Sequence, residues 1–236
     1  MANDYFNFKQ FRINQAKSAF KVGTDGVLLG ASADLNNVTS ILDIGCGTGL
    51  ISLMLAQRCD AIITAIELDS EAFSEACENV RLSKWSDRIK VLNIDLRSFE
   101  PGLHKFDLIV SNPPYFSDSL KNPDPRKAAS RHNDSLTSEE LLRGISRQLE
   151  DNGRFQLILP YVEGNVFIAE AAAYGFYCNK LLKIRPLPDS DIRRLILTFS
   201  RKQLTLLERF LTIEKGKRHE FTEDYISLTK DFYLKF

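Results

Sequence analysis

The chain has 236 residues, 44% of them hydrophobic, which is enough for one α/β domain with a full core. Its 31 basic residues balance 31 acidic ones, which argues against non-specific coating of nucleic acid, because such binding needs an excess of Lys and Arg. No apolar run approaches the roughly 20 residues that span a bilayer, and residues 1–9 do not resemble a signal peptide. We expect a cytoplasmic monomer without a membrane segment.

The four cysteines are too scattered to predict a metal site or a disulfide framework. They form no CxxC pair, whereas zinc sites and disulfide-rich domains need closely spaced sets. We expect reduced thiols and no bound metal. The residues concerned are Cys46, Cys59, Cys77 and Cys178.

Short apolar runs alternate with helical patterns after the amino-terminal segment. This alternation predicts β-α repeats and a mainly parallel sheet. The expected strands are 41–44, 61–66, 89–94, 106–110 and 155–159.

Three helices are expected between these strands. Residues 49–58 have the apolar spacing of an amphipathic helix. Residues 71–82 follow two good N-cap residues. Residues 141–149 follow a capping box that runs from Thr137 to Glu140, and Gly153 is expected to end that helix.

The last third of the chain has a different pattern. Residues 176–184 and 195–199 look like strands whose linker is too short for a crossover helix, so they should pair antiparallel. Another strand over 206–213 and a carboxy-terminal helix or tail should follow. The predicted fold is a Rossmann-like α/β sheet, mainly parallel, with a C-terminal antiparallel hairpin.

A glycine-rich loop joins the first of the predicted α/β strands to the helix that follows it. The glycines Gly45, Gly47 and Gly49 form the pattern GxGxG, and Leu50 replaces the last small residue of the dinucleotide pattern GxGxxG. A ligand without phosphate therefore fits better than NAD, which remains the rival. S-adenosylmethionine has an amino-acid end and a sulfonium instead, and is the cofactor we expect.

Three carboxylates near strand ends support this cofactor. Glu67 ends the second strand, where it can accept hydrogen bonds from both ribose hydroxyls. Asp95 follows the third strand, where the adenine amine would lie. Asp43 precedes the glycines and can orient the loop or meet the cofactor's ammonium through water. Each acid alone could equally be a solvated strand-end residue; their order and spacing make the combination specific.

The residues Asn112, Pro113, Pro114 and Tyr115 follow the fourth strand, at the edge where open α/β sheets bind ligands. Consecutive prolines could simply end a strand. That explanation accounts for neither the Asn nor the Tyr. The Asn112 side-chain oxygen and the Pro113 carbonyl can accept hydrogen bonds from a planar amine and aim its lone pair at a methyl group. Tyr115 offers a ring for stacking.

Five stretches carry a family resemblance: residues 11–15, 21–30, 45–49, 111–116 and 228–233. Together they resemble the bacterial tRNA(Val) adenine N6-methyltransferases, a family of class I methyltransferases. The resemblance implies methylation of the adenine 3′ of the anticodon, position 37. It also implies that Asp25 belongs to a lid over the cofactor, although its segment could equally be a helix packed on the sheet. We expect one domain, with an N-terminal segment and lid (1–33), a catalytic core (34–203) and a C-terminal extension (204–236).

Other functions remain open. A glutamine methyltransferase that modifies release factors shares the Asn-Pro-Pro-Tyr motif, and a guanine N2-methyltransferase of ribosomal RNA is also possible. A DNA adenine methyltransferase is disfavoured because no separate recognition domain is visible. The non-enzyme alternative is an RNA-binding module with a vestigial fold.

A basic segment follows the catalytic motif, and its charges could contact the phosphates of a tRNA substrate. A solvated surface loop is the alternative interpretation. A second basic cluster, Lys215, Lys217 and Arg218, could extend this surface. The residues expected to bind RNA are Lys121, Arg126, Lys127 and Arg131.

Overall fold

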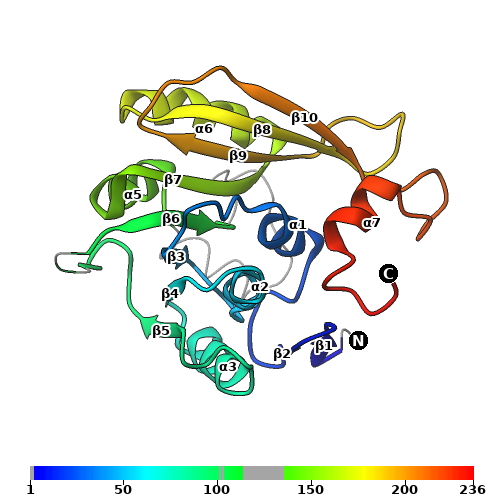
Figure 1. Ribbon diagram of the computed structural model, residues 1–236, viewed down its shortest axis with the longest axis horizontal. Helices are drawn as coiled ribbons and strands as arrows, with labels where there is room; N and C mark the ends of the chain where they lie inside the picture. Colours follow the sequence, from blue (N-terminus) through cyan, green and yellow to red (C-terminus); the bar gives the residue numbers. More distant parts are fainter. Residues whose placement is uncertain (1–2, 101, 103, 114–135) are drawn as a thin grey trace.

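The computed structural model describes residues 3–100, 102, 104–113 and 136–236. Within these ranges, a central sheet of eight strands has the order β10-β8-β9-β7-β6-β3-β4-β5, which runs from top to bottom in Figure 1. The strands are β3 (Ser40–Ile44), β4 (Ile62–Glu67), β5 (Ile89–Asn93), β6 (Phe106–Ser111), β7 (Leu149–Pro160), β8 (Tyr177–Arg185), β9 (Arg194–Ser200) and β10 (Leu207–Thr212).

The pairing of the strands confirms the predicted fold class. Strands β5, β4, β3, β6 and β7 are parallel to one another, whereas β9 is antiparallel to both β7 and β8. The β8–β9 hairpin is the one that the short linker predicted. Strand β10 pairs parallel with β8 and extends the sheet at its edge.

Helices cover both faces of the sheet, with one hydrophobic cluster under each face. One cluster includes residues of α1, α2, α3 and α7, and the other includes residues of α5 and α6. Their bounds are α1 (Thr24–Ser32), α2 (Leu50–Arg58), α3 (Ser70–Arg81), α5 (Ser138–Gln148), α6 (Tyr161–Ala173) and α7 (Glu223–Thr229). Among the described helices, none has the length and apolar character needed to cross a bilayer.

Helix α2 forms where expected, but the prediction that it is amphipathic is wrong. Residues Leu50 to Ala56 are all buried. Helix α1 packs directly on α2, so closely that a Cβ placed on Gly30 would lie 2.8 Å from the Met54 sulfur. Because α1 covers the outer side of α2, the side chains that would otherwise face water are enclosed as well.

The end of helix α5 also differs from the expectation. The predicted capping box is present, with the Thr137 side chain and Glu140 bonded reciprocally. The helix ends at Gln148, however, and β7 begins at the next residue. Gly153 therefore lies inside β7, where the pairing with β6 is irregular, and does not end the helix.

The two ends of the chain meet on one side of the molecule (Figure 1). Lys9 lies in the turn of the hairpin formed by β1 (Tyr5–Asn7) and β2 (Arg12–Asn14). Its ammonium donates to the carbonyls of Lys230 and Phe236 at 2.6 Å each. Aromatic rings of both ends pack together, including Phe8 against Tyr233. The residues after 204 are thus integrated through β10, α7 and this contact.

Candidate active site

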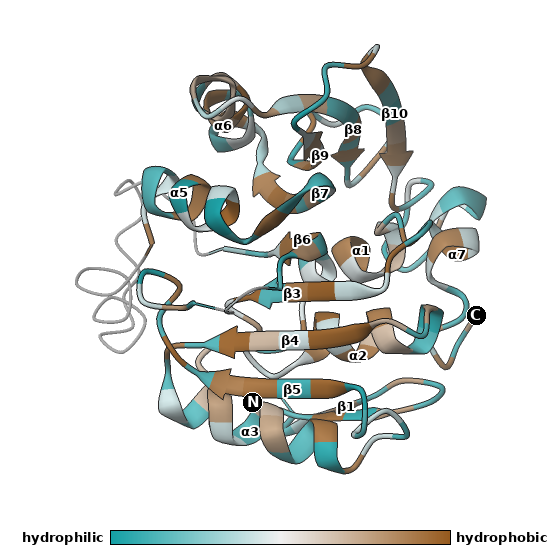
Figure 2. Cartoon of the chain, turned by 60° about the vertical axis from the view of Figure 1, so that its left-hand side comes forward, coloured by the Kyte–Doolittle hydropathy of each residue, from teal (hydrophilic) through white to brown (hydrophobic). Residues whose placement is uncertain are grey.

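The carboxyl ends of four parallel strands bring the candidate residues to one edge of the sheet. Ile44 in β3 is paired with Ile66 in β4 on one side and with Ser111 in β6 on the other. The next residues along the three strands are Gly45, Glu67 and Asn112. These three residues are therefore neighbours at the same edge, toward which the arrowheads of β3, β4 and β5 point in Figure 2.

The glycine loop turns sharply after β3. The amides of Gly45 and Cys46 both donate to the Ile66 carbonyl, at 2.9 and 3.1 Å. Gly45 and Gly47 have φ of 68° and 55°, a left-handed conformation that glycine adopts most easily. A Cβ placed on either residue would meet no described atom within 4 Å. The loop therefore presents open space beside its backbone, where a ligand can approach closely.

The Glu67 carboxylate closes one side of this loop. One of its oxygens accepts from the Gly47 amide at 2.8 Å and the other from the Asp69 amide at 2.9 Å. Burial raises the pKa of Glu67, although these hydrogen bonds oppose the shift. Each carboxylate oxygen can accept more than one hydrogen bond. The group can therefore hold the loop and still accept from two ribose hydroxyls.

Asp43 is fully buried beneath the loop. One carboxylate oxygen accepts from the Ser52 hydroxyl at 2.6 Å, and the other has no hydrogen-bond partner among the described residues. Burial raises the pKa of Asp43 to about 7, and the hydrogen bonds from Ser52 oppose this rise. An unpartnered buried oxygen is costly unless a ligand or water completes it. These residues fit a ligand that carries an ammonium group and a ribose.

Asp95 lies just beyond β5, at the same edge. Its carboxylate accepts from the Arg97 guanidinium at 2.5 Å and from the Arg97 amide at 2.8 Å. Partial burial alone would raise the pKa of Asp95, but the hydrogen bonds from Arg97 outweigh it and lower the pKa. The group is thus an ionised acceptor that already has one basic partner, which the sequence did not indicate.

The first two residues of the predicted catalytic motif, Asn112 and Pro113, lie within the described residues. Asn112 is half-buried and Pro113 is buried at the end of β6. The preceding residue, Ser111, anchors this end by donating its hydroxyl to the Ile44 carbonyl at 2.9 Å. The other predicted residues of the motif, and the basic segment that follows it, lie outside the described residues: Pro114, Tyr115, Lys121, Arg126, Lys127 and Arg131.

The predicted lid residue Asp25 lies in the first turn of α1, a helix that packs on α2. Its carboxylate accepts from the Arg194 guanidinium at 2.8 Å, at the start of β9. Because β9 begins opposite the carboxyl end of β7, Asp25 lies on the active-site side of the sheet. The helix is confirmed, and the lid function stays a prediction.

Two residues of α3 contribute to the site, and no sequence motif indicated them. Glu75 accepts from the amides of Lys17 and Ser18 at 3.0 and 2.9 Å. Asn79 is bonded to the Asn14 backbone and to the Thr48 carbonyl in the glycine loop. Both side chains are buried. They fix the amino-terminal segment beside the cofactor loop.

Within the described ranges, no cluster of three or more His, Cys, Asp or Glu side chains could hold a metal ion. The strand order, the open glycine loop, the buried Asp43 beneath it and Glu67 beside it define a class I methyltransferase that uses S-adenosylmethionine.

Comparisons with known proteins agree. Residues 18–162 match the family model of the methyltransferase small domain. The chain is 44% identical to the tRNA1(Val) (adenine(37)-N6)-methyltransferase of Bacteroides fragilis strain YCH46, with 100% of both chains covered. It is 45% identical to the protein of the same name from Phocaeicola vulgatus, with 99% of both covered. The chain belongs to the family of these relatives.

Solved structures support the fold. A crystal structure described as a predicted O-methyltransferase from Agrobacterium tumefaciens has a TM-score of 0.66 and 24% identity, covering 88% of this chain and 96% of that one. At this level of identity the likeness concerns the fold.

Proposed function

We propose that the chain methylates N6 of adenine 37, the adenine 3′ of the anticodon, in tRNA(Val). The full-length identity of 44% to relatives named for this activity carries the proposal. The position of Asn112 beside Gly45 at one sheet edge supports it, because this places an amine-binding group next to the cofactor loop.

The chemistry proposed for this site depends on geometry and electrostatics. S-adenosylmethionine supplies a methyl group on a positively charged sulfur. The Asn112 side-chain oxygen and the Pro113 carbonyl accept the two hydrogens of the adenine amine. These bonds draw the nitrogen toward tetrahedral geometry and aim its lone pair at the methyl group. The nitrogen becomes acidic once it is methylated, so no strong base is needed during the attack.

The cofactor contacts follow the same edge. Glu67 accepts from the ribose hydroxyls, Asp95 lies at the adenine end, and Asp43 meets the ammonium through water. The glycine loop approaches the ligand by its backbone. We include Asp25 as part of a cover over the cofactor, because it lies at the start of α1 on the active-site side.

The substrate contacts involve residues beyond this edge. Tyr115 stacks on the adenine, which must first leave the stack of the anticodon loop. Lys121, Arg126, Lys127 and Arg131 contact phosphates. In the second basic cluster, Lys215 pairs with Glu223 at 2.8 Å and Lys217 lies 4.0 Å from Glu220; both pairs are exposed, so these lysines can also contact phosphates.

The test is to incubate the protein with labelled S-adenosylmethionine and total RNA from a strain that lacks the gene. The proposal expects label in N6-methyladenosine of tRNA. Label in N2-methylguanosine of ribosomal RNA, or in the glutamine of a release factor supplied in parallel, would favour the corresponding rival.

A further inference from the structure

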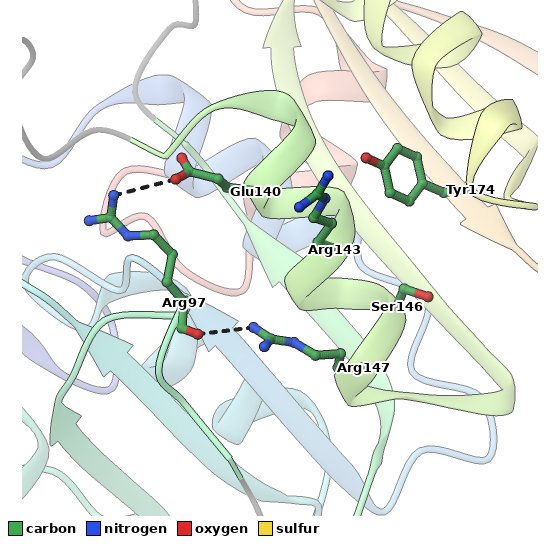
Figure 3. A pocket seen from close by; sticks show the side chains of 6 residues that line it. All are labelled: Arg97, Glu140, Arg143, Ser146, Arg147 and Tyr174. Carbon is green, nitrogen blue, oxygen red and sulfur yellow. Dashed lines mark hydrogen bonds and ion pairs between the residues drawn. The ribbon is translucent and has the colours of Figure 1, made fainter.

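Among the described residues, a basic surface lies along helix α5. It surrounds an open pocket of about 500 Å³ (Figure 3). One wall is Arg97, which follows β5, and most of the remaining wall comes from α5. We call it the arginine pocket; its lining residues are Arg97, Glu140, Arg143, Ser146, Arg147 and Tyr174.

The arginines of this pocket keep unused hydrogen-bond donors. Arg147 donates only to the carbonyls of Leu96 and Arg97, at 3.3 and 3.2 Å, and no carboxylate of the described residues forms an ion pair with it. A guanidinium has five N–H donors in a planar fork that matches a phosphate. Arg147 can therefore bind an anion without giving up an ion pair.

The other two arginines have acidic partners: the Arg143–Glu139 pair is exposed, whereas the carboxylates that pair with Arg97 are partly buried. Arg143 pairs with Glu139 at 2.5 Å, with side chains 67% and 60% exposed. Arg97 lies 3.5 Å from Glu140 as well as beside Asp95. An exposed pair such as Arg143–Glu139 contributes little to stability. A phosphate can therefore bind Arg143 beside the Glu139 carboxylate or in its place.

The pocket is placed to receive RNA bound at the active site. Arg97 is two residues beyond Asp95 in the segment that follows β5, and α5 runs from the carboxyl edge of the sheet toward the amino edge, where β7 begins. The backbone positions of Arg143 and Arg147 are one helical turn apart, about 6 Å along the helix axis. This rise is close to the spacing of neighbouring phosphates in an RNA strand. The two side chains thus form a short basic track that leads away from the catalytic edge.

We propose that Arg143 and Arg147 bind neighbouring backbone phosphates of the tRNA while its adenine occupies the active site. This inference rests on the proposed function, since it assumes a tRNA substrate. Tyr174 lies beside Arg143 at the wall of the same pocket, and its side chain is hydrogen-bonded to that guanidinium. These contacts supply affinity without reading the sequence of the RNA.

The experiment compares the double variant Arg143→Ser/Arg147→Ser with the wild type in binding to tRNA(Val) over a range of salt concentrations. Each lost phosphate contact should flatten the plot of log K against log salt by about 0.7 to 0.9. The KM for tRNA should rise while kcat and cofactor affinity stay near wild type. The matched control is Arg81→Ser/Lys84→Ser, which removes the same charge from exposed residues near the amino end of β5.

Because Arg147 also bonds to backbone carbonyls, Arg143→Ser alone is the second variant and should show about half the change in slope. An unchanged slope in both variants would contradict phosphate binding by the arginine pocket and would leave the proposed function unaffected. An equal loss in the Arg81/Lys84 control would also overturn it, as a general charge effect. If the wild type neither binds nor methylates tRNA(Val), both proposals fall together.

Discussion

The side-chain amide of Asn79 donates to the Thr48 carbonyl in the glycine loop at 3.0 Å. The same carboxamide donates to the Asn14 carbonyl at 2.9 Å and accepts from the Asn14 amide at 2.8 Å. Asn79 is 1% exposed. One buried side chain therefore joins the cofactor loop to the amino-terminal segment.

Replacing Asn79 by Ala should destabilise the fold and weaken cofactor binding. Each buried backbone group left without a partner costs about 1–3 kcal/mol, so a urea titration should show a clearly lower midpoint. Calorimetry should show weaker binding of S-adenosylmethionine, because Thr48 loses its anchor. The control Asn165→Ala removes an exposed amide that bonds only to the Tyr161 carbonyl, and should leave cofactor affinity unchanged. If both variants bound S-adenosylmethionine with equal affinity, Asn79 would have no role in cofactor binding.

Glu67→Ala should weaken the binding of S-adenosylmethionine by roughly 1.5–3 kcal/mol, because the ribose loses its charged acceptor. The binding of NAD should be undetectable in wild type and variant. Isothermal calorimetry with S-adenosylmethionine, with its demethylated product and with NAD measures these affinities. Unchanged affinity in the variant would place the ribose elsewhere.

Because the pKa of Asp43 is raised, the stability of the cofactor-free protein should depend on pH. The pKa of Asp43 is raised from 3.8 to about 7, so the folded protein holds a proton that the unfolded chain releases between these values. The stability associated with this proton is fully present below the unfolded pKa and is lost as the pH rises through about 7. Asp43→Asn is neutral throughout, so its stability relative to wild type should increase from about pH 4 to about pH 8.

Urea titrations at several pH values test this dependence, with Asp107→Asn as the control. Burial alone would raise the pKa of Asp107, but hydrogen bonds from Thr39 and Ser40 outweigh it and lower the pKa below 3.8. The contribution of Asp107 to stability is therefore lost only below about pH 5, and the difference in stability between Asp107→Asn and wild type should stay constant from about pH 5 to about pH 8. A constant difference for Asp43→Asn as well would show that Asp43 is ionised in the fold.

Asn112→Ala should leave cofactor affinity largely intact and lower turnover by orders of magnitude, because the lost hydrogen bonds act mainly on the reacting amine. Single-turnover kinetics with saturating tRNA separates this effect from binding. Tyr115→Ala should raise the KM for RNA, and Tyr115→Phe should be milder because stacking survives. Normal turnover by Asn112→Ala would show that Asn112 does not orient the reacting amine.

Local sequence signals predicted the parts of the fold that depend on neighbouring residues. The capping box at Thr137 and Glu140 formed as expected, because both partners lie within one helical turn. The apolar runs gave the parallel strands, and their ends placed Gly45 and Glu67 side by side.

The features that the sequence did not indicate depend on distant contacts. The outer side of α2 is buried because α1 packs on it through Gly30, which the spacing within α2 alone cannot reveal. Asn79 looks like any polar residue of a helix, and its partner Asn14 is 65 residues away. Arg97 pairs with Asp95 in a turn after β5, where the sequence suggested only a free carboxylate.

The most direct measurement uses two transcripts of tRNA(Val), one with adenine at position 37 and one with guanine there. Each is incubated with the purified protein and labelled S-adenosylmethionine, then digested to nucleosides and separated. The account predicts N6-methyladenosine from the adenine transcript and no label in the guanine transcript. Equal label in both transcripts would contradict the account. No label in either transcript, from a protein preparation that binds S-adenosylmethionine, would also contradict it.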